Sequence, residues 1–427
     1  MKRTLLTFIT ALMAFPLFAQ YTGPGFYRIQ NQGAAGRYIS IQNDKVSEDS
    51  KKIKLSNGTA ANAPVEALQL VKSKDSDPGS ILYISGSESG FTIEAQGMNT
   101  DKLLNDFGYG NIKLQMSSQG ELKTEYSGFQ IDLIDYCYDY PKSRPGFCGI
   151  ATLQFLKQLE TTDRVYALWT FKKIDNENEF FGVYPSENIK IGNKYYTTLF
   201  TSFAYQLPEG MKAFYIDQHN YNVQAIGEPI AELKEITGGK IPAATPVIIE
   251  CSSENAADNK VTLLNENLSS ISNNELKGRV FCFVPTANED QSMKNALEFN
   301  KSTMRVLGLK NIKRDDRGNI VDGQLALVNE ASDNYNNTLS LTNGYIPANK
   351  AYLPISSSYA NATANGIKLL LPEEYAIATS INSVMNDNET TKDGVFTLTG
   401  VKVKDTNSTD NLPRGIYIIG GKKHIVR

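Results

Sequence analysis

The chain contains two histidines, His219 and His424, and these are the residues most suited to acid–base or nucleophilic chemistry. A Ser-His or Cys-His site would have to use His219, because His424 lies in the C-terminal tail. Cys148 is the nucleophile that could pair with it, since it begins a candidate helix whose N-terminus would lower the pKa of the thiol. However, His219 lies in a polar run typical of a surface turn, and cysteines are more often buried or disulfide-bonded. We therefore predict no catalytic residue.

Patterns that bind metals or cofactors are missing from the sequence. Neither histidine has the spacing of a zinc site, no Cys-x-x-Cys pair occurs, and there is no Walker or dinucleotide-binding glycine motif. Asp132, Asp135 and Asp139 lie among tyrosines and could form a sugar or calcium site. Alternation along a strand would instead place them on its solvated face. We predict no metal and no cofactor.

Four cysteines could form two disulfides: Cys137, Cys148, Cys251 and Cys282. Three connectivities are possible, and the local choices are Cys137–Cys148 and Cys251–Cys282. The alternative is that all four are buried free thiols, because a chain of 427 residues can build a core without disulfides.

The first 19 residues have the pattern of a signal peptide, with Lys2 and Arg3 before an apolar segment and Ala19 at the expected cleavage site. No later segment is apolar over a length that would span a membrane. A net charge of −3 argues against general nucleic-acid binding. The mature chain is therefore expected to be secreted or attached to the outer cell surface, with the periplasm as an alternative.

The remaining chain is predicted to be mainly β, with short apolar runs, many aromatic residues and frequent turns. We expect a first unit over 20–185, a β-sandwich unit over 186–371, a polar linker over 372–394 and a short β tail over 395–427. Two copies of an Ile-Pro-Ala motif, at 241–243 and 346–348, each lead into an expected strand. Apolar residues recur every three positions over 148–160, which predicts a helix inserted in the first unit.

Three segments resemble known families. Residues 25–31 (GFYRIQN) and 36–41 (GRYISI) resemble the first repeat of ricin-type β-trefoil modules, although the Gln-x-Trp signature is absent and no sugar-binding residue is carried over. The strands of 190–360 resemble β-sandwich modules of exported Bacteroides and Prevotella proteins. Residues 395–427 are similar to the C-terminal sorting segments of secreted Bacteroidetes proteins. The alternative for this tail is a hairpin that completes an edge of the preceding sandwich.

These features favour a secreted or cell-surface binding or adhesion protein for glycans or host proteins. We expect its binding patch to be shallow and rich in tyrosine, with Tyr38 and Tyr83 of the first unit as candidates. The alternatives are a hydrolase, either a glycosidase with paired carboxylates or a cysteine peptidase, and a purely structural surface component.

Overall fold

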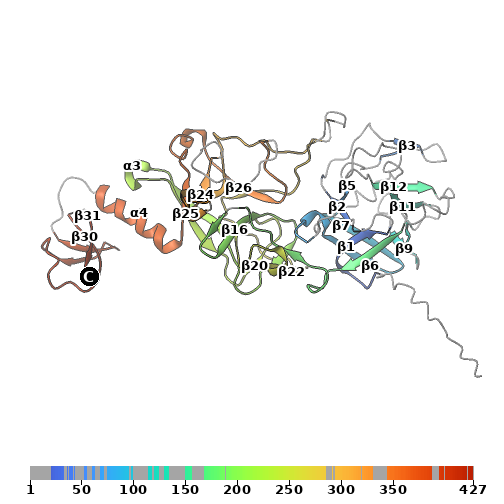
Figure 1. Cartoon of the computed structure of the whole chain (residues 1–427), viewed down its shortest axis with the longest axis horizontal. Helices are drawn as coiled ribbons and strands as arrows, with labels where there is room; N and C mark the ends of the chain where they lie inside the picture. The colour runs from blue at the N-terminus through green and yellow to red at the C-terminus, as the bar shows by residue number, and fades with distance from the viewer. Residues whose placement is uncertain are drawn as a thin grey trace, which may run out of the picture.

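The fold is known from a computed structural model. It describes residues 21–32, 36, 38–41, 43, 52–54, 60–62, 68–71, 75–95, 98–99, 114–117, 120–124, 129–133, 150–155, 168–187, 189–284, 291, 294–318, 320–329, 344–386, 394–398, 400–420 and 422–426. The predicted signal peptide lies outside these residues. The chain is mainly β, as the sequence predicts, and its parts follow one another along the long axis of the molecule (Figure 1).

The N-terminal unit is built on one curled sheet of eleven strands (Figure 1). Its strands are β1 (Gly25–Asn31), β2 (Tyr38–Ile41), β5 (Leu68–Val71), β6 (Leu82–Ser87), β7 (Gly90–Ala95), β8 (Met98–Asn99), β9 (Leu114–Met116), β10 (Leu122–Thr124), β11 (Phe129–Leu133), β12 (Ile150–Phe155) and β13 (Trp169–Lys173). Strands β3 (Lys52–Lys54) and β4 (Ala60–Asn62) pair separately. The alternation seen in the sequence places Tyr27 and Ile29 of β1 in the core. The threefold arrangement of a β-trefoil stays a prediction.

The predicted helix over 148–160 is wrong where the structure describes it. Residues 150–155 form strand β12, which pairs antiparallel with β11 through a bulge at Gln130 and Ile131. A short apolar run does not distinguish a helix from a buried strand, and pairing with a neighbour decides between them. The expected helical insertion is therefore replaced, over these six residues, by another strand of the same sheet.

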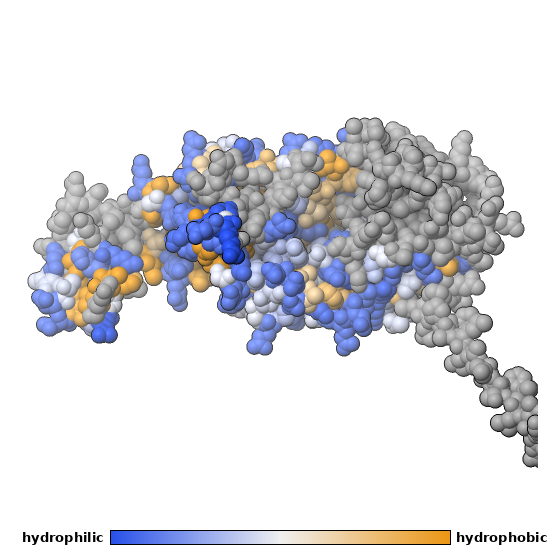
Figure 2. Space-filling view, in the orientation of Figure 1, coloured by the Kyte–Doolittle hydropathy of each residue, from blue (hydrophilic) through white to orange (hydrophobic). Residues whose placement is uncertain are grey.

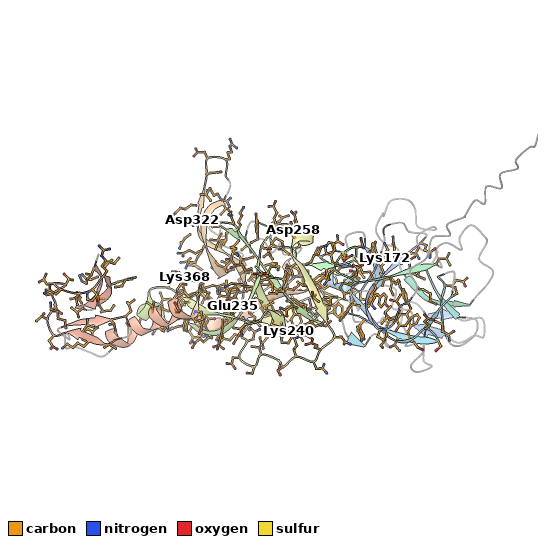
Figure 3. The ribbon with its side chains drawn as sticks, turned by 90° about the horizontal axis from the view of Figure 1, so that it is seen from below. Lys172, Glu235, Lys240, Asp258, Asp322 and Lys368 are labelled. Carbon is orange, nitrogen blue, oxygen red and sulfur yellow. The ribbon has the colours of Figure 1, made fainter. Side chains whose placement is uncertain are left out.

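The central unit is sandwich-like, with a ten-stranded and a four-stranded sheet. Its strands are β14 (Phe181–Gly182), β15 (Lys190–Ile191), β16 (Lys194–Leu199), β17 (Ala204–Gln206), β18 (Lys212–Asn220), β19 (Ile230–Glu235), β20 (Lys240–Ile241), β21 (Val247–Cys251), β22 (Lys260–Leu264), β23 (Lys277–Arg279), β24 (Met304–Arg314), β25 (Ile320–Val328), β26 (Lys350–Pro354) and β27 (Ile367–Leu370). The outer part of the β24–β25 hairpin, where Asp322 lies, projects from the body (Figure 3), and hydrophilic residues cover much of the described surface (Figure 2).

Strand β21 is buried on both faces, which explains its unbroken apolar run. Val247 and Ile249 point into the cluster beneath the four-stranded sheet, whereas Ile248 points into the larger cluster on the opposite side. All three side chains are fully buried. A strand covered on both faces needs apolar residues at every position, so its sequence loses the alternation of a half-exposed strand.

The two Ile-Pro-Ala motifs dock on the same segment at the end of β16. Ile241 and Ile346 are fully buried, and the third residue after each, Ala244 or Asn349, has a positive φ of 54° or 59°. Ala244 N donates to Thr201 O over 2.8 Å, and Asn349 O accepts from the N–H of Phe200 over 2.9 Å. The motifs are thus a repeated device that turns the chain into β21 and into β26.

The expected linker contains helix α4 (Pro372–Asn386), which follows the sandwich (Figure 1). Pro372 stands at the helix start, and Glu374 accepts a hydrogen bond from the N–H of Leu371 over 3.3 Å. Tyr375 is buried against Ile230 and Leu370, so the helix is anchored to the sandwich at its first turn. Among the described helices, none has the length and apolar character needed to cross a membrane.

The tail forms its own four-stranded sheet. Its strands are β28 (Val395–Thr397), β29 (Lys402–Lys404), β30 (Gly415–Ile419) and β31 (Lys422–Val426), in the order β29-β28-β30-β31. Val395, Tyr417 and Ile419 pack in a small core on one face. Within the described residues these strands pair only with one another, so the alternative that the tail completes a sandwich edge is wrong.

Candidate functional site

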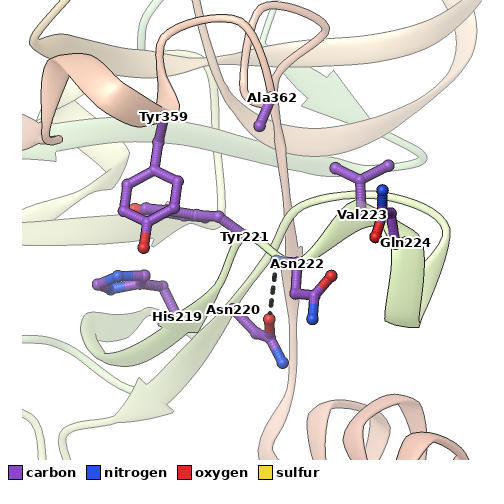
Figure 4. A pocket seen from close by; sticks show the side chains of 8 residues that line it. All are labelled: His219, Asn220, Tyr221, Asn222, Val223, Gln224, Tyr359 and Ala362. Carbon is purple, nitrogen blue, oxygen red and sulfur yellow. Dashed lines mark hydrogen bonds between the residues drawn. The ribbon is translucent and has the colours of Figure 1, made fainter.

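A shallow, open pocket of about 610 Å³ lies where β18 ends and where the loop after β26 passes over it. One wall comes from residues 219–224, which end in the first two residues of the short helix α3 (Val223–Ile226), and the other from Tyr359 and Ala362 (Figure 4). The described lining contains no Lys, Arg, Asp or Glu and no Ser, Thr or Cys. Its polar groups are an imidazole, two phenol hydroxyls and three amides, all of which can form hydrogen bonds.

Three aromatic rings form one side of the pocket (Figure 4). The ring of His219 stacks on that of Tyr221, with centroids 4.1 Å apart and planes at 21°. The ring of Tyr359 meets Tyr221 edge to face, with centroids 5.1 Å apart. Tyr221 is 6% exposed and Tyr359 is 44% exposed. The cluster thus has a buried base and a large aromatic side chain open to solvent.

The amide side chains of residues 219–224 line the pocket beyond this aromatic cluster (Figure 4). Asn220, Asn222 and Gln224 occupy alternate positions where β18 turns into α3. The side-chain oxygen of Asn220 accepts a hydrogen bond from the N–H of Asn222 over 2.9 Å, which fixes the turn (Figure 4). An amide group can donate and accept hydrogen bonds, so this side of the pocket suits a ligand with hydroxyl groups.

Two polar groups of the aromatic cluster, the imidazole of His219 and the hydroxyl of Tyr221, differ in whether they have a hydrogen-bond partner. Nδ1 of His219 hydrogen-bonds Oε2 of Glu275 over 2.6 Å, which orients the imidazole. The hydroxyl of Tyr221 is buried and has no hydrogen-bond partner among the described residues. Burial, reinforced by the negative charge of Glu275, raises the pKa of Tyr221, so this hydroxyl stays protonated.

A buried arginine holds the loop that carries Tyr359. Arg305 of β24 is fully buried, and its guanidinium donates to the carbonyl oxygens of Lys301, Met304, Ala360 and Thr363 and to the Thr363 hydroxyl, over 2.5 to 3.1 Å. Burial lowers the pKa of this guanidinium. The hydrogen bonds to Ala360 and Thr363 fix the loop just beyond Tyr359, so the position of that ring depends on a residue outside the pocket.

The two tyrosines predicted from the sequence do not form a shared exposed patch. Tyr38 is 6% exposed, and its hydroxyl accepts a hydrogen bond from Lys172 Nζ over 3.3 Å. Tyr83 is half-buried, and its hydroxyl accepts one from Asn265 of the central unit over 2.6 Å. They lie beside opposite ends of β1, opposite Gln30 and Phe26. Tyr38 was expected near a loop tip, but it belongs to a strand whose described residues are all buried.

Of the two alternatives for Cys251 and Cys282, a disulfide or free thiols, the structure shows free thiols. Cys251 lies in the core at the end of β21, and burial raises its pKa to about 12. Burial also raises the pKa of Cys282. Cys137 and Cys148 lie outside the described residues, as does any contact between Cys148 and His219. No group of three or more metal-binding side chains occurs in the part of the chain that the structure describes.

The pocket was only partly accessible to sequence reasoning. The run from Gln218 to Gln224 is dense in amide and aromatic side chains, and this signal could have marked one wall. The opposite wall comes from Tyr359, about 140 positions later in the chain, and no local pattern links the two.

Comparisons with known proteins leave the family open. No family model and no curated protein matches the chain. One solved structure, that of a mosquitocidal holotoxin, matches with a TM-score of 0.23 and 9% identity, over 74% of this chain and 40% of the toxin chain. The chain thus spans less than half of that protein, and a similarity at this level carries no argument about fold or function.

Proposed function

We propose that this protein is an exported glycan-binding protein and that the pocket at the end of β18 binds a neutral sugar. The observation that carries the proposal is the exposed ring of Tyr359 beside a stacked His219–Tyr221 pair, with a row of amide side chains lining the same pocket. An aromatic face packs against the C–H groups of a sugar ring, and amides hydrogen-bond its hydroxyls.

The shape and charge of the site support the same ligand class. The pocket is open and shallow, which suits the end or a branch of a saccharide rather than a fully enclosed small molecule. Its described lining lacks charged carboxylate and ammonium groups, so it offers no counter-charge for an acidic sugar. The fixed loop beyond Tyr359 presents the ring without a large ordering cost on binding.

Export and surface location belong to the proposal as well. They are supported by the signal-like segment over 1–19 and by the resemblance of the tail to sorting segments. A surface location would give a sugar-binding protein access to glycans outside the cell that makes it.

The test is a glycan array probed with residues 20–427, followed by calorimetric titration of any sugar that binds. We expect Tyr359→Ala to weaken binding at least tenfold, a loss of about 1.4 kcal/mol or more. The matched control is Tyr184→Ala, because Tyr184 is 54% exposed and lies outside the pocket. Its affinity should stay within twofold of the wild type.

Either of two results would contradict the proposal. The first is a well-folded protein that binds no glycan on the array. The second is a sugar whose affinity is the same with and without the Tyr359 ring, which would place the binding surface elsewhere.

A further inference from the structure

Both outer strands of the tail sheet, β29 and β31, lack a described partner on one side, and β31 is the longer of the two. In the order β29-β28-β30-β31, strand β31 pairs with β30 over Lys422–Val426, and no described strand pairs with its other side. The outward N–H and C=O groups of such an edge can pair with an added strand. Many proteins that recognise extended peptides bind them in this way.

The face of the sheet beside this edge combines apolar and basic side chains. Ile416 lies opposite Ile425, and Ile418 lies opposite Lys423, so all four side chains point to the same face. Ile425 is 66% exposed and Ile416 is 38% exposed, whereas Ile418 is 5% exposed, so the apolar surface open to a partner comes from Ile425 and Ile416. The small core of the tail lies on the other face, so these isoleucines make little contribution to it. Apolar surface of the tail is visible in Figure 2.

The charge of the tail is opposite to that of the rest of the chain. Residues 395–427 contain six Lys or Arg and two Asp, a net charge of +4, whereas the whole chain carries −3, so residues 1–394 carry −7. Lys423 is exposed and lies on the open edge strand. Pairing of two β31 strands from two copies of the chain would bring like charges together, which disfavours self-association through this edge.

From this arrangement we infer that the tail binds an extended acidic segment of a partner protein, which adds as a fifth strand beside β31. The side chains opposite Ile425 and Lys423 would lie on one face, two residues apart. The segment therefore has an apolar residue and an acidic residue at alternate positions. This interaction surface is independent of the sugar pocket, because it uses a different sheet and different side chains.

The probe for this inference is a labelled peptide of Val-Thr-Glu-Thr repeats, which places Val and Glu on one face of a strand. Its binding to residues 20–427 is measured by fluorescence anisotropy at low salt, with Val-Thr-Lys-Thr repeats as the control peptide. We expect the Glu peptide to bind at least tenfold more tightly than the Lys peptide, and its affinity to fall as salt is raised.

Two variants test whether the peptide binds beside β31. Lys423→Glu and Ile425→Ser should each weaken binding of the Glu peptide at least fivefold. The matched control is Lys277→Glu, which makes the same charge change on β23, an exposed position on the edge strand of another sheet. Lys277→Glu should bind the Glu peptide with an affinity within twofold of that of the wild type. Circular dichroism of each variant verifies that the sheets remain folded.

The inference is overturned if the Glu peptide does not bind, or if it binds Lys423→Glu as well as the wild type. Two parallel measurements test whether an anionic lipid surface or a second copy of the chain binds to this face instead. Co-sedimentation with phosphatidylglycerol vesicles, lost in Ile425→Ser, without peptide binding would assign the face to an anionic lipid surface. Concentration-dependent dimerisation lost in the same variant would assign it to a second copy of the chain.

Discussion

Lys350 is a half-buried residue whose ammonium group lies inside the protein. Its Nζ donates to the hydroxyl of Thr197 over 2.6 Å, and burial lowers its pKa to about 8. The nearby Cys251 thiol acts in the opposite direction, but more weakly. The residue follows the second Ile-Pro-Ala motif, so the entry of β26 into the fold forces this charge into the interior.

This burial predicts a pH dependence of stability. An unfolded lysine has a pKa of about 10.4, so above pH 8 the unfolded state binds more protons than the folded state, and stability rises with pH. Between pH 8 and pH 9 we expect Lys350 to contribute an increase of about 1 kcal/mol to the free energy of unfolding in urea. Lys350→Met should remove this increase. Equal slopes for the two proteins would show that the ammonium is not enclosed. Cys251 acts in the opposite direction over the same window, because its pKa is raised to about 12 in the folded state and is about 8.5 in the unfolded state. The contribution of Lys350 is therefore the difference in slope between the wild type and Lys350→Met.

Ala244 occupies a backbone conformation that suits glycine better. Its φ of 54° is left-handed, and an L-residue with a Cβ is disfavoured there by about 1–2 kcal/mol. Ala244→Gly should therefore stabilise the protein by about 0.5–1 kcal/mol after the entropy of the freer unfolded chain is subtracted. Ala243→Gly is the control, since Ala243 is also exposed but has no positive φ, and it should destabilise slightly. Thermal melts of both variants measure the difference, and a lower melting temperature for Ala244→Gly would contradict the prediction.

At the scale of elements, Arg305 connects β24 to the loop over 356–366. Arg305→Leu would leave several buried carbonyl oxygens without a donor, and we expect a loss of about 3 kcal/mol in the free energy of unfolding. The loop that carries Tyr359 should also loosen, so its amide hydrogens should exchange faster with solvent. Arg317→Leu, at an exposed turn, is the control and should change stability by less than about 0.5 kcal/mol. Unchanged exchange of residues 356–366 in Arg305→Leu would show that the arginine does not hold the loop.

The elements also show where sequence reasoning succeeds. The Ile-Pro-Ala motifs and the alternation of β1 specify strands locally, and both are found as strand entries or strands in the structure. The helix expected over 148–160 and the exposed position expected of Tyr38 depend on neighbours distant in the chain, and both are wrong. Arg305 gave no signal in the sequence, because nothing local indicates that a charged residue will be buried among carbonyl groups. The same limit concealed the pairing of Tyr359 with Tyr221.

At the scale of the whole molecule, the N-terminal and central units share a packed boundary. Ile81, from the segment just before β6, is fully buried in the central cluster that contains Phe181 and Val261. Arg28 of β1 is also buried, and its guanidinium lies 3.4 Å from the carboxylate of Glu179. Apolar packing and an enclosed ion pair at one boundary should make the two units unfold together.

The single tryptophan makes this cooperativity measurable. Trp169 lies fully buried in β13, so its fluorescence reports on the N-terminal unit, whereas far-ultraviolet circular dichroism reports on all the sheets. In the wild type we expect the two urea transitions to coincide. Ile81→Ala removes contacts at the boundary at a cost of about 3 kcal/mol, and the fluorescence transition should then occur at lower urea than the dichroism transition. Ile367→Ala, in the other central cluster, is the matched control and should lower both transitions together. If the fluorescence transition of the wild type already occurred at lower urea than the dichroism transition, the boundary would not couple the two units. The N-terminal and central units would then unfold independently.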